Sequence, residues 1–127
     1  PNGLPGVGDR MQVFWSTAVA AGKISPNKFV ELTSTNPAKI FGMYPQKGSL
    51  TPGADADILI LDPNQQVKYG VAHSHQRTDY NLYEGWQLTG TIDKVFLRGN
   101  LIVDGDQWHG RAGMGRFLHR KPFENLI

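Results

Sequence analysis

The segment of residues 33–62 constrains the fold of this chain more than any other part, because it joins two halves of different character. It contains the run Thr-Ser-Thr-Asn-Pro-Ala-Lys-Ile-Phe-Gly at residues 33–42, the turn Lys47-Gly48, and the run Gly-Ala-Asp-Ala-Asp-Ile-Leu-Ile-Leu-Asp at residues 53–62. Before this segment, apolar residues recur at helical spacing; after it, they come in short runs bounded by turn residues. We therefore expect a helical half that leads into a strand-rich half.

Three helices are predicted in the first half. Asp9 is the expected N-cap of the first helix, because its carboxylate can accept hydrogen bonds from the free N–H groups of a first turn, and Gly22 is expected to end it. Ser25-Pro26 and Asn36-Pro37 predict the starts of the second and third helices, since each places a proline after a capping side chain. Each helix has one apolar face and needs a partner surface that this chain does not supply.

Short strands are predicted in the second half. The run Ile58-Leu59-Ile60-Leu61 is continuously apolar, which is typical of a strand buried on both faces. Tight turns are expected at Arg98-Gly99-Asn100 and at Asp104-Gly105-Asp106, whereas residues 73–81 are polar and predict a loop. The other expected strands are residues 67–69, 86–88, 94–97, 101–103 and 107–108.

Composition excludes several classes of protein. The chain has no cysteine, which excludes a disulfide scaffold or a thiolate metal site and is compatible with a cytoplasmic location. No apolar run approaches the roughly 20 residues that cross a bilayer, and a net charge of +2 without a basic stripe gives no support to nucleic-acid binding. The turn-rich start without an initiator Met predicts that the chain begins inside a larger protein.

Motifs along the whole chain occur in the order that a known enzyme family shows. In chain order they are Pro1-Asn2-Gly3, Asp9-Arg10-Met11, residues 29–42, Tyr44-Pro45, Lys47-Gly48, residues 53–57, Tyr80-Asn81, Glu84-Gly85, Arg98-Gly99 and Gly115-Arg116-Phe117. In this order they resemble the C-terminal part of the hydantoinase/dihydropyrimidinase family, the cyclic amidohydrolases of the amidohydrolase superfamily. The resemblance covers essentially all 127 residues.

The resemblance implies an α/β fold: the C-terminal part of a TIM-like (β/α)₈ barrel, with its terminal helices, plus part of a β-sandwich domain. Residues 1–46 would be the terminal barrel loop and helices, residues 47–110 the sandwich strands, and residues 111–127 an extended C-terminal arm. That arm carries Phe117 and Phe123, and we expect it to pack on another subunit of a homotetramer. The remaining partner of the segment would be the rest of the barrel.

The resemblance also implies an activity: hydrolysis of the ring amide bond of hydantoins or dihydropyrimidines. The family uses two divalent metal ions, usually zinc, held by a His-x-His pair, a carboxylated Lys, two further His and an Asp, all of which would precede Pro1. This segment would then hold no catalytic residue and no metal ligand, and would be inactive alone. Asn2 is the one residue expected at the substrate, where it would hydrogen-bond a cyclic ureide or imide.

His73-Ser74-His75 has the spacing of a metal-binding pair, because two residues two apart on a strand point to one face. The pair follows the segment 33–62, however, lies in a polar stretch and has no third ligand nearby. We expect a solvated loop there.

Asp55 and Asp57 are expected to have a structural role at a strand start rather than to act as an acid/base pair. Asp9 and Arg10 are expected to form a structural ion pair at a helix start. Three other functions stay open: a non-catalytic dihydropyrimidinase-related scaffold, an allantoinase-like hydrolase and a small β-rich interaction module.

Overall fold

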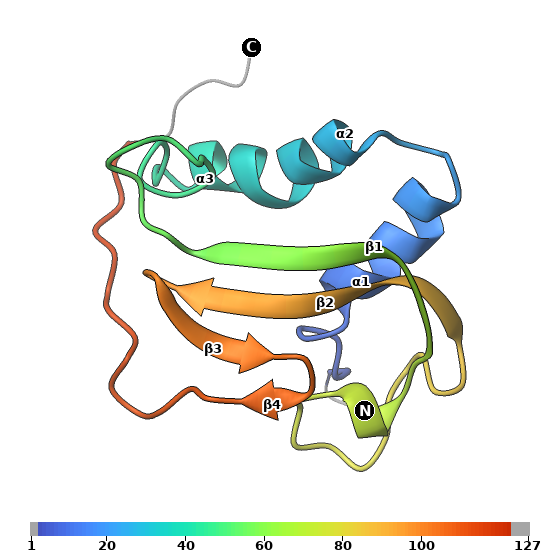
Figure 1. Ribbon diagram of the computed structural model, residues 1–127. Coiled ribbons are helices and arrows are strands. Elements are labelled where there is room, and N and C mark those ends of the chain that lie inside the picture. The colour runs from blue at the N-terminus through green and yellow to red at the C-terminus, as the bar shows by residue number, and fades with distance from the viewer. Residues whose placement is uncertain (1–2, 123–127) are drawn as a thin grey trace.

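The chain folds into a four-stranded antiparallel sheet with helices packed beside it (Figure 1). The computed structural model describes residues 3–122. The first helical segment consists of α1 (Arg10–Phe14) and the π-helix η1 (Trp15–Ala20); the second consists of α2 (Pro26–Val30), the π-helix η2 (Glu31–Thr35) and α3 (Asn36–Ile40). The sheet contains β1 (Ile58–Lys68), β2 (Gln87–Leu97), β3 (Asn100–Asp104) and β4 (Gln107–Trp108), with the short 3₁₀ turn η3 (Val71–His73) after β1. None of the described helices is long and apolar enough to cross a membrane.

Most of the predicted helix boundaries are confirmed. The Ser25 hydroxyl accepts a hydrogen bond of 3.2 Å from the Lys28 N–H, as expected of an N-cap. Gly22 follows the first helical segment with φ +71°, and Gly42 follows the second with φ +64°. Asp9 occupies the N-cap position of α1, but its side chain makes no capping hydrogen bond. That prediction is wrong, because the carboxylate turns instead to side chains that lie far away in the sequence.

The prediction of a separate third helix at Asn36-Pro37 is also wrong. Asn36 has helical φ and ψ angles of −65° and −45°, and its N–H donates to the carbonyl of Glu31, five residues earlier. Residues 26–40 therefore form one continuous helical segment. The wider turns of η2 directly precede Pro37, and such π-type irregularities let a helix pass a proline that the interior of a regular α-helix does not accommodate.

The sheet follows chain order, β1-β2-β3-β4, and every neighbouring pair is antiparallel. Its two long strands each replace two short predicted ones: residues 67–69 were expected as a strand separate from 58–61, and 86–88 as one separate from 94–97. The β1–β2 register shifts between Asp62 and Gln66, so an irregular stretch that looks like a break in the sequence continues the ladder. The tight turn predicted at residues 98–100 is confirmed as a two-residue turn, since Arg98 and Gly99 have φ of +45° and +78° and Asn100 already belongs to β3.

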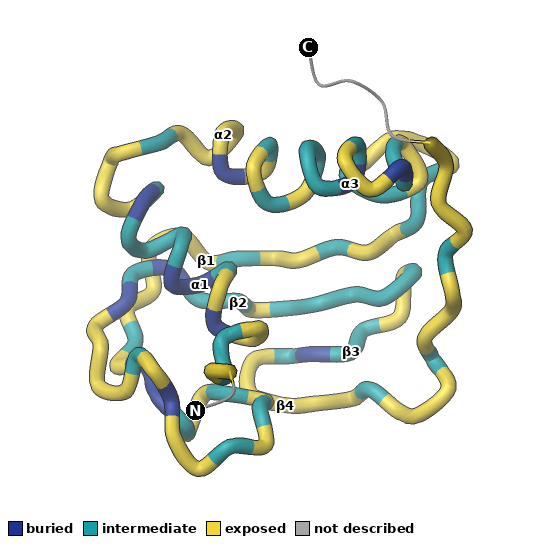
Figure 2. Tube along the Cα trace, turned by 180° about the vertical axis from the view of Figure 1, so that it is seen from behind, coloured by how far each residue is buried: buried dark blue, intermediate teal, exposed yellow. Residues whose placement is uncertain are grey.

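A small core joins the first helical segment to the sheet. Val13 of α1, Tyr69 after β1 and Leu88 of β2 are buried against one another, with Val67 and Tyr83 packed beside them. Figure 2 shows many buried positions around α1 and the nearby loops and further ones on α2, α3 and β3, whereas the outer side of the second helical segment is exposed.

The two helical segments meet through aromatic rings. The Phe29 ring centroid lies 5.4 Å from that of Phe14 and 5.3 Å from that of Trp15. These contacts place α2 on the first segment, which in turn packs on β2.

Apolar side chains stay exposed on β1, contrary to the prediction for residues 58–61. Leu59 is 36% exposed and Ile60 is 43% exposed. The described residues therefore cover these two side chains only in part, and within the same residues β1 is also an edge strand with a hydrogen-bonded neighbour on one side only. The second helical segment likewise exposes Val30, Leu32, Ile40 and Phe41.

The C-terminal residues leave β4 without helix or strand and return to the end of α3 (Figure 1). The N–H of Lys121 donates to the carbonyl of Gly42 at 2.9 Å, and the Arg98 guanidinium donates to the carbonyl of Met114. Phe117 is 84% exposed, while Phe123 lies outside the described residues. The extended arm is present as far as residue 122, and its packing on another subunit stays a prediction.

Candidate functional site

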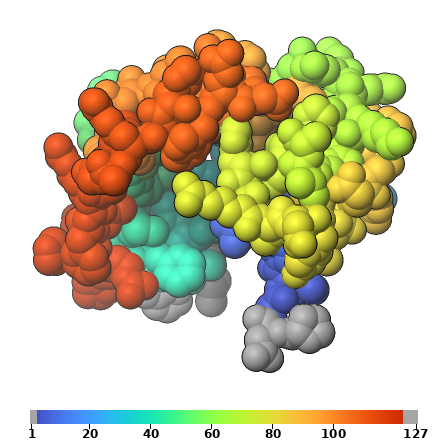
Figure 3. Space-filling view, turned by 90° about the horizontal axis from the view of Figure 1, so that it is seen from below, coloured from blue at the N-terminus to red at the C-terminus, as the bar shows by residue number. Residues whose placement is uncertain are grey.

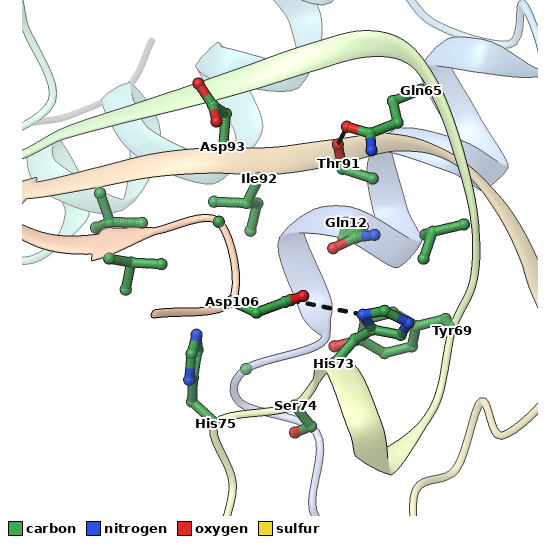
Figure 4. A pocket seen from close by; sticks show the side chains of 15 residues that line it. Gln12, Gln65, Tyr69, His73, Ser74, His75, Thr91, Ile92, Asp93 and Asp106 are labelled. Carbon is green, nitrogen blue, oxygen red and sulfur yellow. Dashed lines mark hydrogen bonds and ion pairs between the residues drawn. The ribbon is translucent and has the colours of Figure 1, made fainter. Parts of the chain in front are cut away.

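The molecule is hollowed between the loop after β1 and the C-terminal residues, as Figure 3 shows. A cavity of about 400 Å³ lies at the start of α1, between that loop and the sheet. Figure 4 shows its polar lining, to which every neighbouring element contributes: Gln12 from α1, Gln65 from β1, Tyr69, His73, Ser74 and His75 from the loop, Thr91 and Asp93 from β2, and Asp106 from the β3–β4 turn. The apolar side chains of Val67, Ile92, Val95 and Val103 line the cavity as well, so its lining is mixed.

The two histidines of the cavity face different partners. His73 and Asp106 point toward each other in Figure 4, with 3.5 Å between Nδ1 and Oδ1, and both side chains are well exposed. The His75 ring instead lies 5.9 Å from the Trp108 ring. Across the described residues, 3–122, no group of three or more His, Cys, Asp and Glu side chains is placed to hold a metal ion.

A buried carboxylate lies beside the cavity, at the start of α1. Asp9 is 0% exposed. Its Oδ1 accepts three hydrogen bonds: from the Tyr69 hydroxyl at 2.7 Å, from Gln76 Nε2 at 3.0 Å and from Asn81 Nδ2 at 3.2 Å. Its Oδ2 is buried and has no hydrogen-bond partner among the described residues. Burial, and secondly the hydrogen bond to Asp9, raise the pKa of Tyr69, so the phenol stays protonated and donates.

Sequence reasoning missed this Asp9 cluster, which we define as Asp9, Tyr69, Gln76 and Asn81. Asp9 was assigned to a helix cap and to an ion pair with Arg10, both of which are local interactions. Its actual partners are 60 to 72 positions away along the chain. One feature of the sequence pointed to this region: Asn81, at the end of the polar loop 73–81, belongs to one of the family motifs. No local sequence pattern, however, links that loop to Asp9.

The acidic pair at the start of β1 is structural, as predicted. Lys47 Nζ lies 2.9 Å from Asp55 Oδ2 and also binds Asp57, whose Oδ1 accepts the Arg98 N–H at 2.8 Å. Desolvation lowers the pKa of Lys47, but the hydrogen bonds to Asp57 and Asp55 outweigh it and hold that pKa above its usual value. The hydrogen bond from Lys47 lowers the pKa of Asp55. These ion pairs connect the end of the helical half to the β2–β3 turn.

Asn2, the predicted substrate residue, lies outside the described residues. The described loop that continues from it runs through Gly3 and Gly8 to Asp9. The cavity, the Asp9 cluster and this loop therefore lie at one end of α1.

Comparison with known proteins assigns the family. The amidohydrolase family profile matches residues 6–102. This chain belongs to the amidohydrolase family. D-phenylhydantoinase from Escherichia coli O127:H6 is 50% identical over 123 residues, which are 97% of this chain and 27% of that protein. The chain thus spans about a quarter of the length of the curated relatives it matches.

Solved structures of amidohydrolases share its fold. D-hydantoinase from Bacillus sp. AR9 superposes with a TM-score of 0.94 at 42% identity, over 98% of this chain and 28% of that one. Dihydropyrimidinase from Brevibacillus agri NCHU1002 gives a TM-score of 0.88 at 45% identity, over 92% and 25%. An L-hydantoinase from Arthrobacter aurescens gives 0.81 at 32% identity, over 86% and 24%. The expected resemblance to hydantoinases and dihydropyrimidinases is confirmed, and relatives named for either stereochemistry share this fold.

Proposed function

We propose that this amidohydrolase chain is a segment of a metal-dependent hydantoinase or dihydropyrimidinase, and that the complete polypeptide hydrolyses the ring amide bond of hydantoins or dihydropyrimidines. The observation that supports this most strongly is the 50% identity to D-phenylhydantoinase over 97% of the chain. The TM-scores of 0.94 and 0.88 to a D-hydantoinase and a dihydropyrimidinase agree with it.

The proposed architecture assigns residues 1–46 to the end of a TIM-like barrel, residues 47–110 to a β-sandwich and residues 111–127 to a C-terminal arm. Exposed apolar side chains on the second helical segment and on β1 support it, because both surfaces need a cover that the described residues lack. The arm, with Phe117 exposed, would contact another subunit of a tetramer.

The proposed catalytic centre lies outside this segment. Two divalent metal ions, zinc in our proposal, would be held by residues of the remaining polypeptide, as the family resemblance implies. They would supply Lewis-acid activation of the reaction. Asn2 would contribute hydrogen bonds to the cyclic ureide. A cytoplasmic location belongs to the same proposal and is supported by the absence of cysteine.

Turnover by the complete polypeptide tests the proposal. Purified protein should open the rings of hydantoin and dihydrouracil, as followed by chromatography of the N-carbamoyl products. A chelator should abolish turnover and added zinc should restore it, because the reaction needs the metal. The 127-residue segment, assayed beside it, should be inactive.

A folded, metal-loaded complete polypeptide that opens neither ring would contradict the proposal. Turnover of allantoin alone would assign the allantoinase-like alternative, and turnover of none of the three would favour the non-catalytic scaffold.

A further inference from the structure

Residues 111–122 leave the sheet after β4 and return to the helical half, where they reach the end of α3 (Figure 1). They form no helix or strand, and most of their side chains are exposed. A segment of this kind opens easily unless it is held at particular points. Contacts near its two ends hold it.

The first attachment is to the β2–β3 turn. The Arg98 guanidinium donates a hydrogen bond to the carbonyl of Met114. Arg98 is itself fixed, since it lies in the tight turn and its N–H donates to Asp57 Oδ1 at 2.8 Å. Asp57 also binds Lys47. The beginning of the segment is therefore joined to the ion pairs at the start of β1.

The second attachment is to Gly42, at the end of α3. The N–H of Lys121 donates to the carbonyl of Gly42 at 2.9 Å. A Cβ on Gly42 would overlap the Lys121 carbonyl oxygen and would lie 2.8 Å from the carbonyl carbon, closer than Cβ atoms approach in real structures. The Arg120 guanidinium lies 6.0 Å from the centre of the Phe41 ring, at the limit of a cation–π contact. Position 42 therefore needs a glycine for this approach as well as for its φ of +64°.

Main-chain atoms provide the segment's side of both hydrogen bonds, at Met114 and at Lys121. Its one phenylalanine among the described residues, Phe117, is 84% exposed and so does not hold the segment in place. The side chains between the two attachments consequently stay available to other partners, including the other subunit proposed above.

The attached ends belong to parts of the molecule that have little other contact. The second helical segment meets the first through Phe29, and the first segment packs on β2. At the far end of α3, the connection of residues 43–57 with its Lys47 ion pairs leads to the sheet. A second connection there would oppose separate opening of the two parts.

We propose that residues 111–122 act as an intramolecular strap: attached at Gly42 and at Arg98, they hold the end of α3 to the β2–β3 turn and close the junction between the helical half and the sheet. A strap holds only while both ends are attached. Loss of either attachment should therefore have nearly the same effect as loss of both.

Substitution of Gly42 in the complete polypeptide tests the strap. Gly42→Ala adds a collision with Lys121 to the strain of a positive φ, whereas Gly53→Ala adds only the strain, because nothing lies within 4 Å of a Cβ there. Gly42→Ala should lower the melting temperature more than Gly53→Ala. It should also speed tryptic cleavage after Arg116 about tenfold, as measured by mass spectrometry, because the protease acts on the released segment.

Arg98→Met removes the other attachment and leaves the main-chain hydrogen bond to Asp57 in place. It should lower the melting temperature and speed the same cleavage, whereas Arg77→Met, at an exposed position, should change neither. In a Gly42→Ala background, Arg98→Met should lower the melting temperature by less than half as much as in the wild type, because the two residues act through one strap.

Additive effects of Gly42→Ala and Arg98→Met would overturn the inference. Equal melting temperatures and cleavage rates for Gly42→Ala and Gly53→Ala would overturn it as well. If Gly42→Ala does not fold, Arg98→Met against Arg77→Met decides the matter: faster cleavage after Arg116 in Arg98→Met alone supports the strap, and an unchanged rate refutes it. None of these measurements requires turnover, so their outcome is independent of the proposed function.

Discussion

At the scale of single residues, Lys47 shows how one side chain holds the helical half to the strands. Its ammonium group lies between Asp55 and Asp57, and its side chain is only 16% exposed. Lys47→Met keeps the apolar stem but leaves two neighbouring carboxylates without their cation. We expect a lower melting temperature, measured by circular dichroism on the complete polypeptide, because the carboxylates then repel each other.

Lys28→Met is the matched control for Lys47→Met. Lys28 pairs with Glu31 at 2.7 Å, but both side chains are more than 40% exposed. Exposed pairs of this kind contribute little, so the melting temperature should fall less than for Lys47→Met. An equal or larger fall for the control would contradict the role given to Lys47.

The effect of Lys47→Met should depend on pH in a defined window. The folded pKa of Asp55 is lowered from 3.8, so its contribution is present above pH 3.8 and is lost as the pH falls through the folded pKa. The folded pKa of Lys47 is raised from 10.5, so its contribution is present below pH 10.5 and is lost as the pH rises through the folded pKa. The difference in melting temperature between wild type and variant should be constant between these limits and shrink outside them. A difference that changes through neutral pH would argue against this assignment.

At the scale of secondary-structure elements, Gly90 lets the first helical segment pack on β2. Gly90 has φ +95°, and a Cβ there would lie 2.6 Å from Trp15 Nε1. Gly90→Ala should therefore lower the free energy of unfolding by about 2 kcal/mol or more, because it combines backbone strain with overpacking against the indole. Urea unfolding of the complete polypeptide, followed by tryptophan fluorescence, measures this.

Gly53→Ala separates the two causes. Gly53 has nearly the same φ, +92°, but nothing lies within 4 Å of the added Cβ. It should show only the backbone strain of about 1 kcal/mol. If Gly90→Ala lowers the free energy of unfolding no more than Gly53→Ala does, the packing of the Trp15 indole on β2 does not require a glycine at position 90.

The elements also show which features the sequence could predict. Ser25-Pro26 and Arg98-Gly99 were assigned correctly, because a cap and a two-residue turn depend on residues that are neighbours in the chain. Asn36-Pro37 carries the same cap signal as Ser25-Pro26, yet it lies inside a continuous helical segment. The π-helical turns of η2 come just before Pro37 and let the helix continue past the proline.

The candidate site was less predictable than the elements. The Asp9 cluster brings together residues 9, 69, 76 and 81, and its geometry depends on how α1 docks on the sheet. No spacing rule along the sequence expresses that docking. Motif order identified the family, but it gave no role to Asp9.

At the scale of the whole molecule, burial is low for a chain of 127 residues. Leu88 is the only large apolar side chain below 2% exposure among the described residues, whereas many large apolar residues stay accessible. A chain of this length can bury a substantial core of its own. The exposed apolar surface therefore supports a fold that is completed by further polypeptide.

Leu32 offers a direct test of that completion. It lies in η2 and is 43% exposed in this segment. In the complete polypeptide, Leu32→Gln should lower the free energy of unfolding by about 2 kcal/mol, because a buried leucine is replaced by a polar amide. In the isolated segment, where Leu32 is already 43% exposed, the same change should lower stability by less than in the complete polypeptide and reduce binding of a hydrophobic dye.

Asn27→Gln, at an exposed position of the same helical segment, is the control and should be neutral in both contexts. Because Leu32→Gln is measured both in the isolated segment and in the complete polypeptide, a difference between the two results reports on the surroundings of Leu32 and not on the type of substitution. Equal and small effects of Leu32→Gln in the segment and in the complete polypeptide would mean that this helical face stays in water. The exposed apolar residues would then have to be explained by a partner other than the remainder of the barrel, and the assignment of residues 1–46 to the barrel would fail.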